Sequence, residues 1–225
     1  MRYCVADVHG EYDLFCRLLD LIQFNEQDEM FICGDIIDKG PHSIQLARLV
    51  FSLPNIHCIL GNHEFEFLKY YYALMQDPTD NFDVILERLR KYFQDGHLLE
   101  WRVIDAIEAL PLYIEEKDFI CVHAGAPLDC NGRLLPLKNA EAEQLVYDRK
   151  FKDPSILPLS EKCVFFGHTP TSYITGNTDV LTYPRINSPK CVADYYKIAL
   201  DTGANLHKTL GCFCIDTLQT YYVKE

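Results

Sequence analysis

The chain has 225 residues, of which 48% are hydrophobic, and its formal net charge is −12. This composition allows a sizeable core, and we expect one domain over residues 1–225. The acidic balance argues against sequence-independent binding to nucleic acid or to an anionic membrane, because both require clustered cations. No apolar run is long enough to span a membrane and the first residues carry charge, so we expect a cytoplasmic protein.

The cysteine pattern indicates reduced thiols rather than a disulfide framework. The chain has ten cysteines but no CxxC pair of the kind used by zinc modules or redox motifs. A free cysteine inside an apolar run behaves as a small hydrophobic residue. We therefore expect core packing for Cys4, Cys33, Cys58, Cys121 and Cys163, and also for the alternating pair Cys212 and Cys214.

The first sixty residues alternate short apolar segments with segments of helical periodicity. Strands are predicted for residues 2–6, 29–33 and 56–60. Apolar residues recur at helical spacing between them, at Leu14, Phe15, Leu18, Leu19 and Ile22 and then at Ile44, Leu46, Leu49 and Val50. This order is typical of an α/β domain.

The middle of the chain is predicted to be helical and the last part to be rich in strands. A helical insertion at about residues 64–110 contains "FEFLKYYYALM", "FDVILERLRKYF" and "LLEWRVIDAIEAL", which "QDPTDN" and "QDGH" separate. Strands are predicted for residues 112–115, 119–123, 162–166, 196–200, 210–215 and 219–223. Loops rich in Pro, Asn, Asp and Gly are predicted for residues 125–139 and 174–194.

The stretch "GDIIDKG" places Asp35 and Asp38 three residues apart, directly behind an apolar run. Taken alone, it is compatible with an ordinary polar turn, since Gly and Asp are favoured in turns. The choice between a turn and a ligand-bearing loop depends on the rest of the chain.

Possible metal ligands follow the predicted strands five times: Asp7 and His9 in "VADVHG", Asp35 in "CGDIID", Asn62 and His63 in "ILGNHE", His123 in "CVHAG", and His168 in "FFGHTP". In open α/β sheets such residues converge beyond the carboxyl ends of the strands. Carboxylate and imidazole donors suit Mn, Fe or Zn, and there are more of them than one tetrahedral ion requires. We therefore expect two divalent metal ions, and we interpret His42, His57, His97 and His207 as structural or solvated.

In order and spacing, these blocks resemble those of the phosphoprotein phosphatase family, within the calcineurin-like metallophosphoesterase superfamily. The resemblance extends from about residue 5 to residue 203 and is strongest to the short bacterial and phage serine/threonine phosphatases, which share "FGHTP" and "LDTG". It implies an α/β sandwich of two mixed β-sheets flanked by helices, with the helical insertion.

The resemblance also implies roles for individual residues. Asp7, His9 and Asp35 would hold the first metal ion, and Asp35, Asn62, His123 and His168 the second. A hydroxide bridging the ions would attack phosphorus in line. His63 would protonate the leaving oxygen while Asp38 orients its imidazole.

The match is less complete at the phosphate-binding positions. Lys39 stands where the family has an arginine, which keeps the charge but loses the planar fork. Arg149, in "QLVYDRKF", is the candidate for a second phosphate-binding arginine, and Asn62 would also contact phosphate. Ala6 replaces the usual glycine of the first block, where we expect an effect on backbone packing alone.

The first functional interpretation is a binuclear metal-dependent phosphomonoesterase acting on phosphoserine or phosphothreonine in proteins. An alternative is hydrolysis of diadenosine tetraphosphate, other nucleotides or small phosphate esters, because fold-level resemblance does not select the substrate. A non-catalytic metal-binding scaffold is an alternative of another class. A structural zinc protein fits poorly, since structural zinc sites favour shells rich in cysteine.

Overall fold

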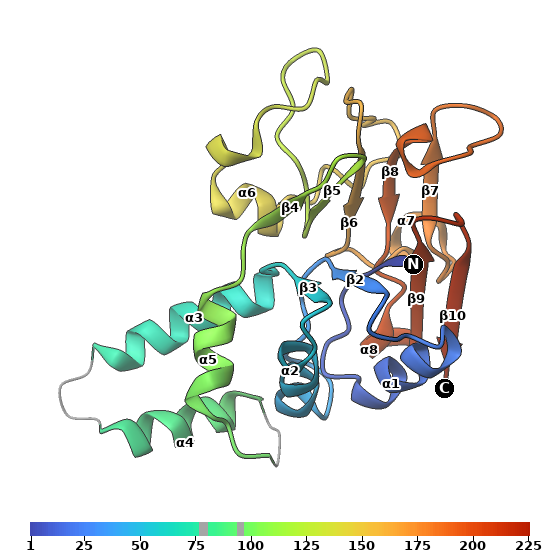
Figure 1. The fold of residues 1–225 in the computed structure, drawn as a ribbon. Helices are drawn as coiled ribbons and strands as arrows, with labels where there is room; N and C mark the ends of the chain where they lie inside the picture. Colours follow the sequence, from blue (N-terminus) through green and yellow to red (C-terminus); the bar gives the residue numbers. More distant parts are fainter. Residues whose placement is uncertain (77–80, 94–96) are drawn as a thin grey trace.

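Two five-stranded mixed sheets form the centre of the molecule in the computed structural model, which describes residues 1–76, 81–93 and 97–225 (Figure 1). The first sheet has the spatial order β10 (Thr220–Lys224), β9 (Thr209–Cys214), β1 (Arg2–Val5), β2 (Glu29–Ile32) and β3 (Ile56–Cys58). The second has the order β4 (Tyr113–Glu115), β5 (Phe119–Val122), β6 (Cys163–Phe166), β8 (Tyr195–Ala199) and β7 (Leu181–Pro184). Within the sheets, β1, β2 and β3 run parallel to one another, as do β5, β6 and β8.

The inner strands β1, β2, β5 and β6 are apolar on both faces because each sheet is covered on both sides there. In β1, Tyr3 and Val5 pack toward the helices, whereas Cys4 packs toward the second sheet. In β5, Phe119 packs toward the first sheet and Ile120 toward the opposite face. This alternation follows the period of two of an extended chain.

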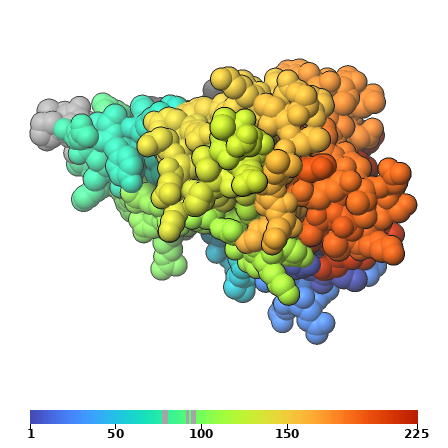
Figure 2. Space-filling view, turned by 90° about the horizontal axis from the view of Figure 1, so that it is seen from above, coloured from blue at the N-terminus to red at the C-terminus, as the bar shows by residue number. Residues whose placement is uncertain are grey.

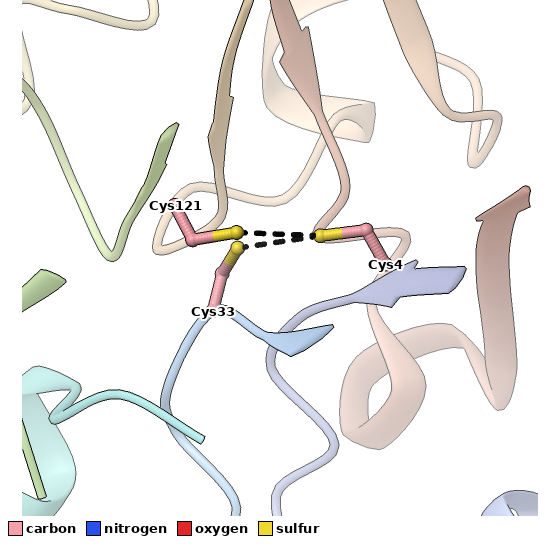
Figure 3. Close-up of side chains that lie close together, drawn as sticks. All are labelled: Cys4, Cys33 and Cys121. Atoms are coloured by element: carbon pink, nitrogen blue, oxygen red, sulfur yellow. Dashed lines mark hydrogen bonds between the residues drawn. The ribbon is translucent and has the colours of Figure 1, made fainter. Parts of the chain in front are cut away.

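Three thiols meet in the layer between the two sheets. The Sγ atom of Cys4 lies 3.7 Å from that of Cys33 and 3.8 Å from that of Cys121 (Figure 3). All three side chains are fully buried, and all ten cysteines of the chain are free. The predicted burial of Cys58, Cys163, Cys212 and Cys214 is also confirmed.

Helices cover the outer face of the first sheet and extend beyond it. The longer helices are α1 (Tyr12–Leu21), α2 (Ser43–Ser52), α3 (Asn62–Met75), α4 (Phe82–Phe93) and α5 (Trp101–Glu108). Of these, α3, α4 and α5 extend to one side of the sheets (Figures 1 and 2). Shorter helices are α6 (Ala142–Tyr147), α7 (Ser172–Thr175), α8 (Ala204–His207), η1 (Leu137–Asn139) and η2 (Val192–Asp194). No helix in the described part of the chain is both apolar and long enough to cross a bilayer.

The predicted α/β sandwich is confirmed, and every predicted strand is present with its ends shifted by at most two residues. The segment at residues 174–194 departs from its prediction as a loop, because it contains β7 and η2. Strand β7 is an edge strand that ends at Pro184 and pairs with β8 alone, so its signal in the sequence is weak. The predicted separators "QDPTDN" and "QDGH" lie mostly outside the described residues.

Candidate metal centre

The site lies where several strands end and turn sharply. Asp7, Asp35 and His168 follow β1, β2 and β6, and their φ angles are 53°, 56° and 67°. His9 and Asp38 also have positive φ. Side chains other than glycine adopt this conformation at a cost of about 1–3 kcal/mol each, and such strain gathers at functional sites.

Two glycines allow the ligand loops to approach each other closely. A Cβ atom on Gly61 would overlap the carboxylate of Asp35, and one on Gly167 would overlap that of Asp7. The residue before Asn62 and the residue before His168 therefore have to lack a side chain. This explains why the chain reads "GN" and "GH" at these two strand ends.

The first set of donors consists of Asp7, His9 and Asp35. His9 Nε2 lies 3.5 Å from Asp35 Oδ2 and 3.9 Å from Asp7 Oδ1. His9 Nδ1 lies 3.2 Å from the carbonyl oxygen of Ile37, which fixes the proton on Nδ1 and leaves the Nε2 lone pair facing the carboxylates.

The second set consists of Asp35, Asn62, His123 and His168. Asn62 Oδ1 lies 2.9 Å from His123 Nε2 and 2.7 Å from His168 Nδ1. His123 Nε2 is also 3.5 Å from Asp35 Oδ2, and its Nδ1 is held by the carbonyl oxygen of Cys33 at 2.8 Å. Asp35 therefore lies between the two sets.

The chemistry of these donors fits divalent cations. Burial raises the pKa of Asp7 well above its usual range, and the charges of Asp201 and Asp35 raise it further. Burial lowers the pKa of His9 to about 4 and that of His168 to about 3, so both imidazoles are neutral, the form that binds metals. In addition, His168 Nε2 is buried without a hydrogen-bond partner among the described residues. Clustered buried carboxylates and neutral imidazoles are a donor set that cations stabilise.

His63 and Asp38 form a pair at the edge of the donor sets. His63 Nδ1 lies 2.7 Å from Asp38 Oδ2, and its Nε2 lies 3.9 Å from Asp35 Oδ2. Burial lowers the pKa of His63, but the hydrogen bond to Asp38 and the charge of Asp35 outweigh it and raise the pKa above its ordinary value. The imidazole is therefore held by Asp38 with its Nε2 toward the donor sets, which is the placement that a proton donor requires.

Lys39 and Arg149 both reach a cavity of about 260 Å³ that opens over His9, His168 and Asp201. Lys39 Nζ lies 2.9 Å from His9 Nε2. Arg149 lies close enough to His168 for its charge to contribute to the low pKa of that imidazole. The structure thus brings every candidate residue of the sequence to one place.

Two buried carboxylates of the site, Glu64 and Asp201, lie in motif blocks of the sequence but have no predicted role there. Glu64 accepts hydrogen bonds from the backbone N–H groups of Asp35, Ile36, Ile37 and Gly61 at 2.9 to 3.1 Å. Its position in "GNHE", three residues after the residue that caps α3, is a capping-box signal. Asp201, in "LDTG", lines the cavity, and burial raises its pKa to about 7.

The histidines interpreted as structural or solvated lie away from the donor sets. His207 Nε2 is 2.8 Å from Ser172 Oγ, and His57 Nε2 is 3.6 Å from Glu29 Oε1. The rings of His42 and His97 contact each other, with centroids 6.0 Å apart.

Comparison with curated proteins shows similarity to symmetrical bis(5′-nucleosyl)-tetraphosphatases. The Coxiella burnetii protein is 34% identical over 132 residues, which cover 57% of this chain and 43% of that protein. The Wigglesworthia glossinidia brevipalpis protein is 45% identical over 72 residues, which cover 31% of this chain and 26% of that protein. The chain thus matches less than half the length of these relatives.

Comparison with solved structures supports the fold. A structure provisionally assigned as a diadenosine tetraphosphatase has a TM-score of 0.70 at 17% identity, covering 99% of this chain and 92% of that one. A serine/threonine phosphatase from Saccharomyces cerevisiae has a TM-score of 0.59 at 15% identity, covering 100% and 79% of the two chains. The family model of calcineurin-like phosphoesterases matches residues 3–200. The chain therefore belongs to the calcineurin-like phosphoesterase family.

Proposed function

We propose that the chain hydrolyses dinucleoside polyphosphates of the diadenosine tetraphosphate class. The similarity to the curated symmetrical bis(5′-nucleosyl)-tetraphosphatases carries this choice of substrate. The sequence alone ranks phosphoproteins first, and these relatives favour the nucleotide alternative instead. The structural likeness to protein phosphatases supports the shared fold and does not select a substrate.

The donor sets support a binuclear centre. Asp7, His9 and Asp35 would hold one ion, and Asp35, Asn62, His123 and His168 would hold the other. When bound, two divalent cations neutralise phosphate charge and lower the pKa of water. The mixture of carboxylate and imidazole favours manganese, with iron and zinc as the other candidates.

The remaining polar residues bind and protonate the substrate in this proposal. Lys39 and Arg149, which line the cavity over the donor sets, pair with phosphate oxygens. Asn62 adds an amide contact. His63 donates a proton from Nε2 to the leaving oxygen, while Asp38 holds Nδ1–H and stabilises the charged imidazole. Reduced thiols and a nucleotide substrate are both consistent with a cytoplasmic protein.

A turnover panel tests this function. The protein is stripped with a chelator, reloaded with Mn²⁺, and assayed with diadenosine tetraphosphate, a phosphoserine peptide and p-nitrophenyl phosphate. We expect kcat/KM to be highest on the dinucleotide, with two equal nucleotide halves as products. Asp35→Asn removes a charge from both donor sets and serves as the metal-site control. We expect this variant to lose bound metal and turnover together and to keep the circular dichroism spectrum of the wild type.

The panel also separates the alternatives. A higher kcat/KM on the phosphoserine peptide would replace the nucleotide proposal with the phosphoprotein one. Two bound ions with no turnover of any substrate would favour the non-catalytic scaffold. Near-normal turnover and two bound ions in Asp35→Asn would contradict the shared position of Asp35.

A further inference from the structure

The cavity over the donor sets continues into a second, larger one. The neighbouring groove has a volume of about 510 Å³, and both hollows are lined by Arg149 and Tyr173. These two residues come from different segments, since Arg149 follows α6 and Tyr173 lies in α7. A ligand that extends past Arg149 could therefore reach this groove.

The groove is cationic although the chain is acidic. Arg149, Lys150 and Lys152 line it, and among the described residues none forms an ion pair with their side chains. The acidic residue of the lining, Asp153, accepts hydrogen bonds from the backbone N–H and the hydroxyl of Ser155 at 2.8 and 2.7 Å. Unpaired cations in a chain of net charge −12 favour an anionic ligand at this place.

An aromatic ring stands at the junction of the two hollows. Tyr173 is 66% exposed, so its ring is accessible to a ligand in either hollow. Ile156 and other apolar residues lie in the same groove. An exposed ring can stack on a nucleotide base, and the cations beside it can pair with the phosphates of the same nucleotide.

Hydrogen bonds from Lys197 fix the backbone of the segment that carries Lys150 and Lys152. The buried ammonium group of Lys197 donates to the carbonyl oxygens of Phe151 and Asp153 at 2.6 and 2.7 Å. These bonds fix the backbone on both sides of Lys152. A groove wall that is ordered in advance loses less entropy when a ligand binds.

We infer that this groove binds the leaving half of a dinucleoside polyphosphate. The phosphates of that half pair with Lys150 and Lys152, and its base stacks on Tyr173. The inference rests on the proposed function, because it assigns a place to the nucleotide that departs. It gives the chain a means of distinguishing a dinucleotide from a small phosphate ester.

The test compares groove variants with a control of equal charge. Lys150→Ala/Lys152→Ala removes the cations, and Lys117→Ala/Lys138→Ala removes the same charge from exposed positions outside the groove. Two readouts are measured: KM for diadenosine tetraphosphate, and the inhibition constant of ADP against p-nitrophenyl phosphate hydrolysis. We expect the groove variant to raise both the KM for diadenosine tetraphosphate and the inhibition constant of ADP by about tenfold, because the free energies of two exposed charge pairs together amount to about that change in affinity. Neither kcat nor KM for p-nitrophenyl phosphate should change.

A second pair of variants tests the stacking. Tyr173→Ala is expected to raise the inhibition constant of ADP by about 5- to 100-fold, whereas Tyr173→Phe keeps the ring and the affinity. Unchanged ADP inhibition in both groove variants, or an equal change in the charge control, would overturn the inference. Failure of the wild type to cleave the dinucleotide would count against the proposed function alone, because the inhibition constants of ADP still decide whether the groove binds a nucleotide.

Discussion

The carboxylate of Glu64 accepts a hydrogen bond of 2.9 Å from the backbone N–H of Asp35, the residue that lies between the two donor sets. Three further N–H groups, from Ile36, Ile37 and Gly61, also donate to Glu64. The side chain is fully buried and does not line the cavity over His9, His168 and Asp201. Glu64 is thus a positioning residue that holds the loop of Asp35.

We expect Glu64→Gln to destabilise the protein by about 2–4 kcal/mol, because its amide nitrogen would face N–H donors and leave some of them without an acceptor. Affinity for Mn²⁺ falls in the same variant, since the Asp35 loop loses its anchor. Urea unfolding and calorimetric titration with Mn²⁺ measure the two effects. Glu66→Gln, an exposed position on the same helix, is the control, and a change in Glu64→Gln no larger than that of the control would refute the positioning role.

The pair of His63 and Asp38 predicts a dependence on the leaving group. A general acid matters most for a poor leaving group such as the alkoxide of serine. We expect His63→Asn to keep its metal yet lose about 10²- to 10⁴-fold in kcat on a phosphoserine peptide, with a clearly smaller loss on p-nitrophenyl phosphate. In Asp38→Asn we expect smaller losses of kcat, again larger on the phosphoserine peptide than on p-nitrophenyl phosphate, because this variant removes only the residue that orients His63. Equal losses on both substrates with metal intact would show that His63 binds phosphate instead.

Lys39 lies between the candidate metal donor His9 and the cavity over His9, His168 and Asp201. Its ammonium group contacts His9 Nε2, a nitrogen that cannot accept this hydrogen bond and bind a metal ion at the same time. A metal ion bound at His9 Nε2 would therefore free the Lys39 ammonium group to pair with phosphate. We expect Lys39→Ala to lower kcat/KM by about tenfold with both ions retained, and Lys39→Arg to preserve it, since both residues offer a cation to phosphate. Steady-state kinetics together with metal analysis of each variant tests this prediction. An unchanged kcat/KM in Lys39→Ala would place the residue outside the phosphate site.

Lys197 predicts a pH dependence of stability away from the metals. Burial lowers its pKa to about 8, below the value of an unfolded lysine. Between these two pKa values the unfolded chain binds more protons than the folded one, so the free energy of unfolding rises with pH. We expect this rise to reach about 3 kcal/mol from pH 8 to pH 10.5, and to be absent from Lys197→Met. Urea unfolding of both proteins over this range measures the difference, and parallel pH profiles would contradict the assignment.

Much of the fold could be predicted because local patterns and tertiary structure agree. Apolar residues on both faces of β1, β2, β5 and β6 are what covered sheets require. The candidate ligands could be found because they follow these strands directly, and the carboxyl ends of parallel strands meet at one edge.

Other features could not be predicted because they depend on contacts between distant segments. Glu64 has the sequence signal of an ordinary helix cap, and its bonds to the Asp35 loop arise from tertiary folding. The groove combines Lys150 and Lys152 with Tyr173, which lies in α7, a short helix that the sequence does not predict. Strand β7 lies among turn-forming residues and becomes extended only because β8 pairs with it.

The trio of thiols in the core has a mechanical consequence for the metal centre. Cys4 comes three residues before Asp7, and Cys33 and Cys121 come two residues before Asp35 and His123. Because the trio lies where the sheets face each other, its bulk acts as a spacer that sets how far the ligands of one sheet stand from those of the other (Figure 3). A substitution at Cys4, Cys33 or Cys121 that adds or removes one methylene would then change the distance between the candidate ligands of the two sheets. None of the ligands themselves would be replaced.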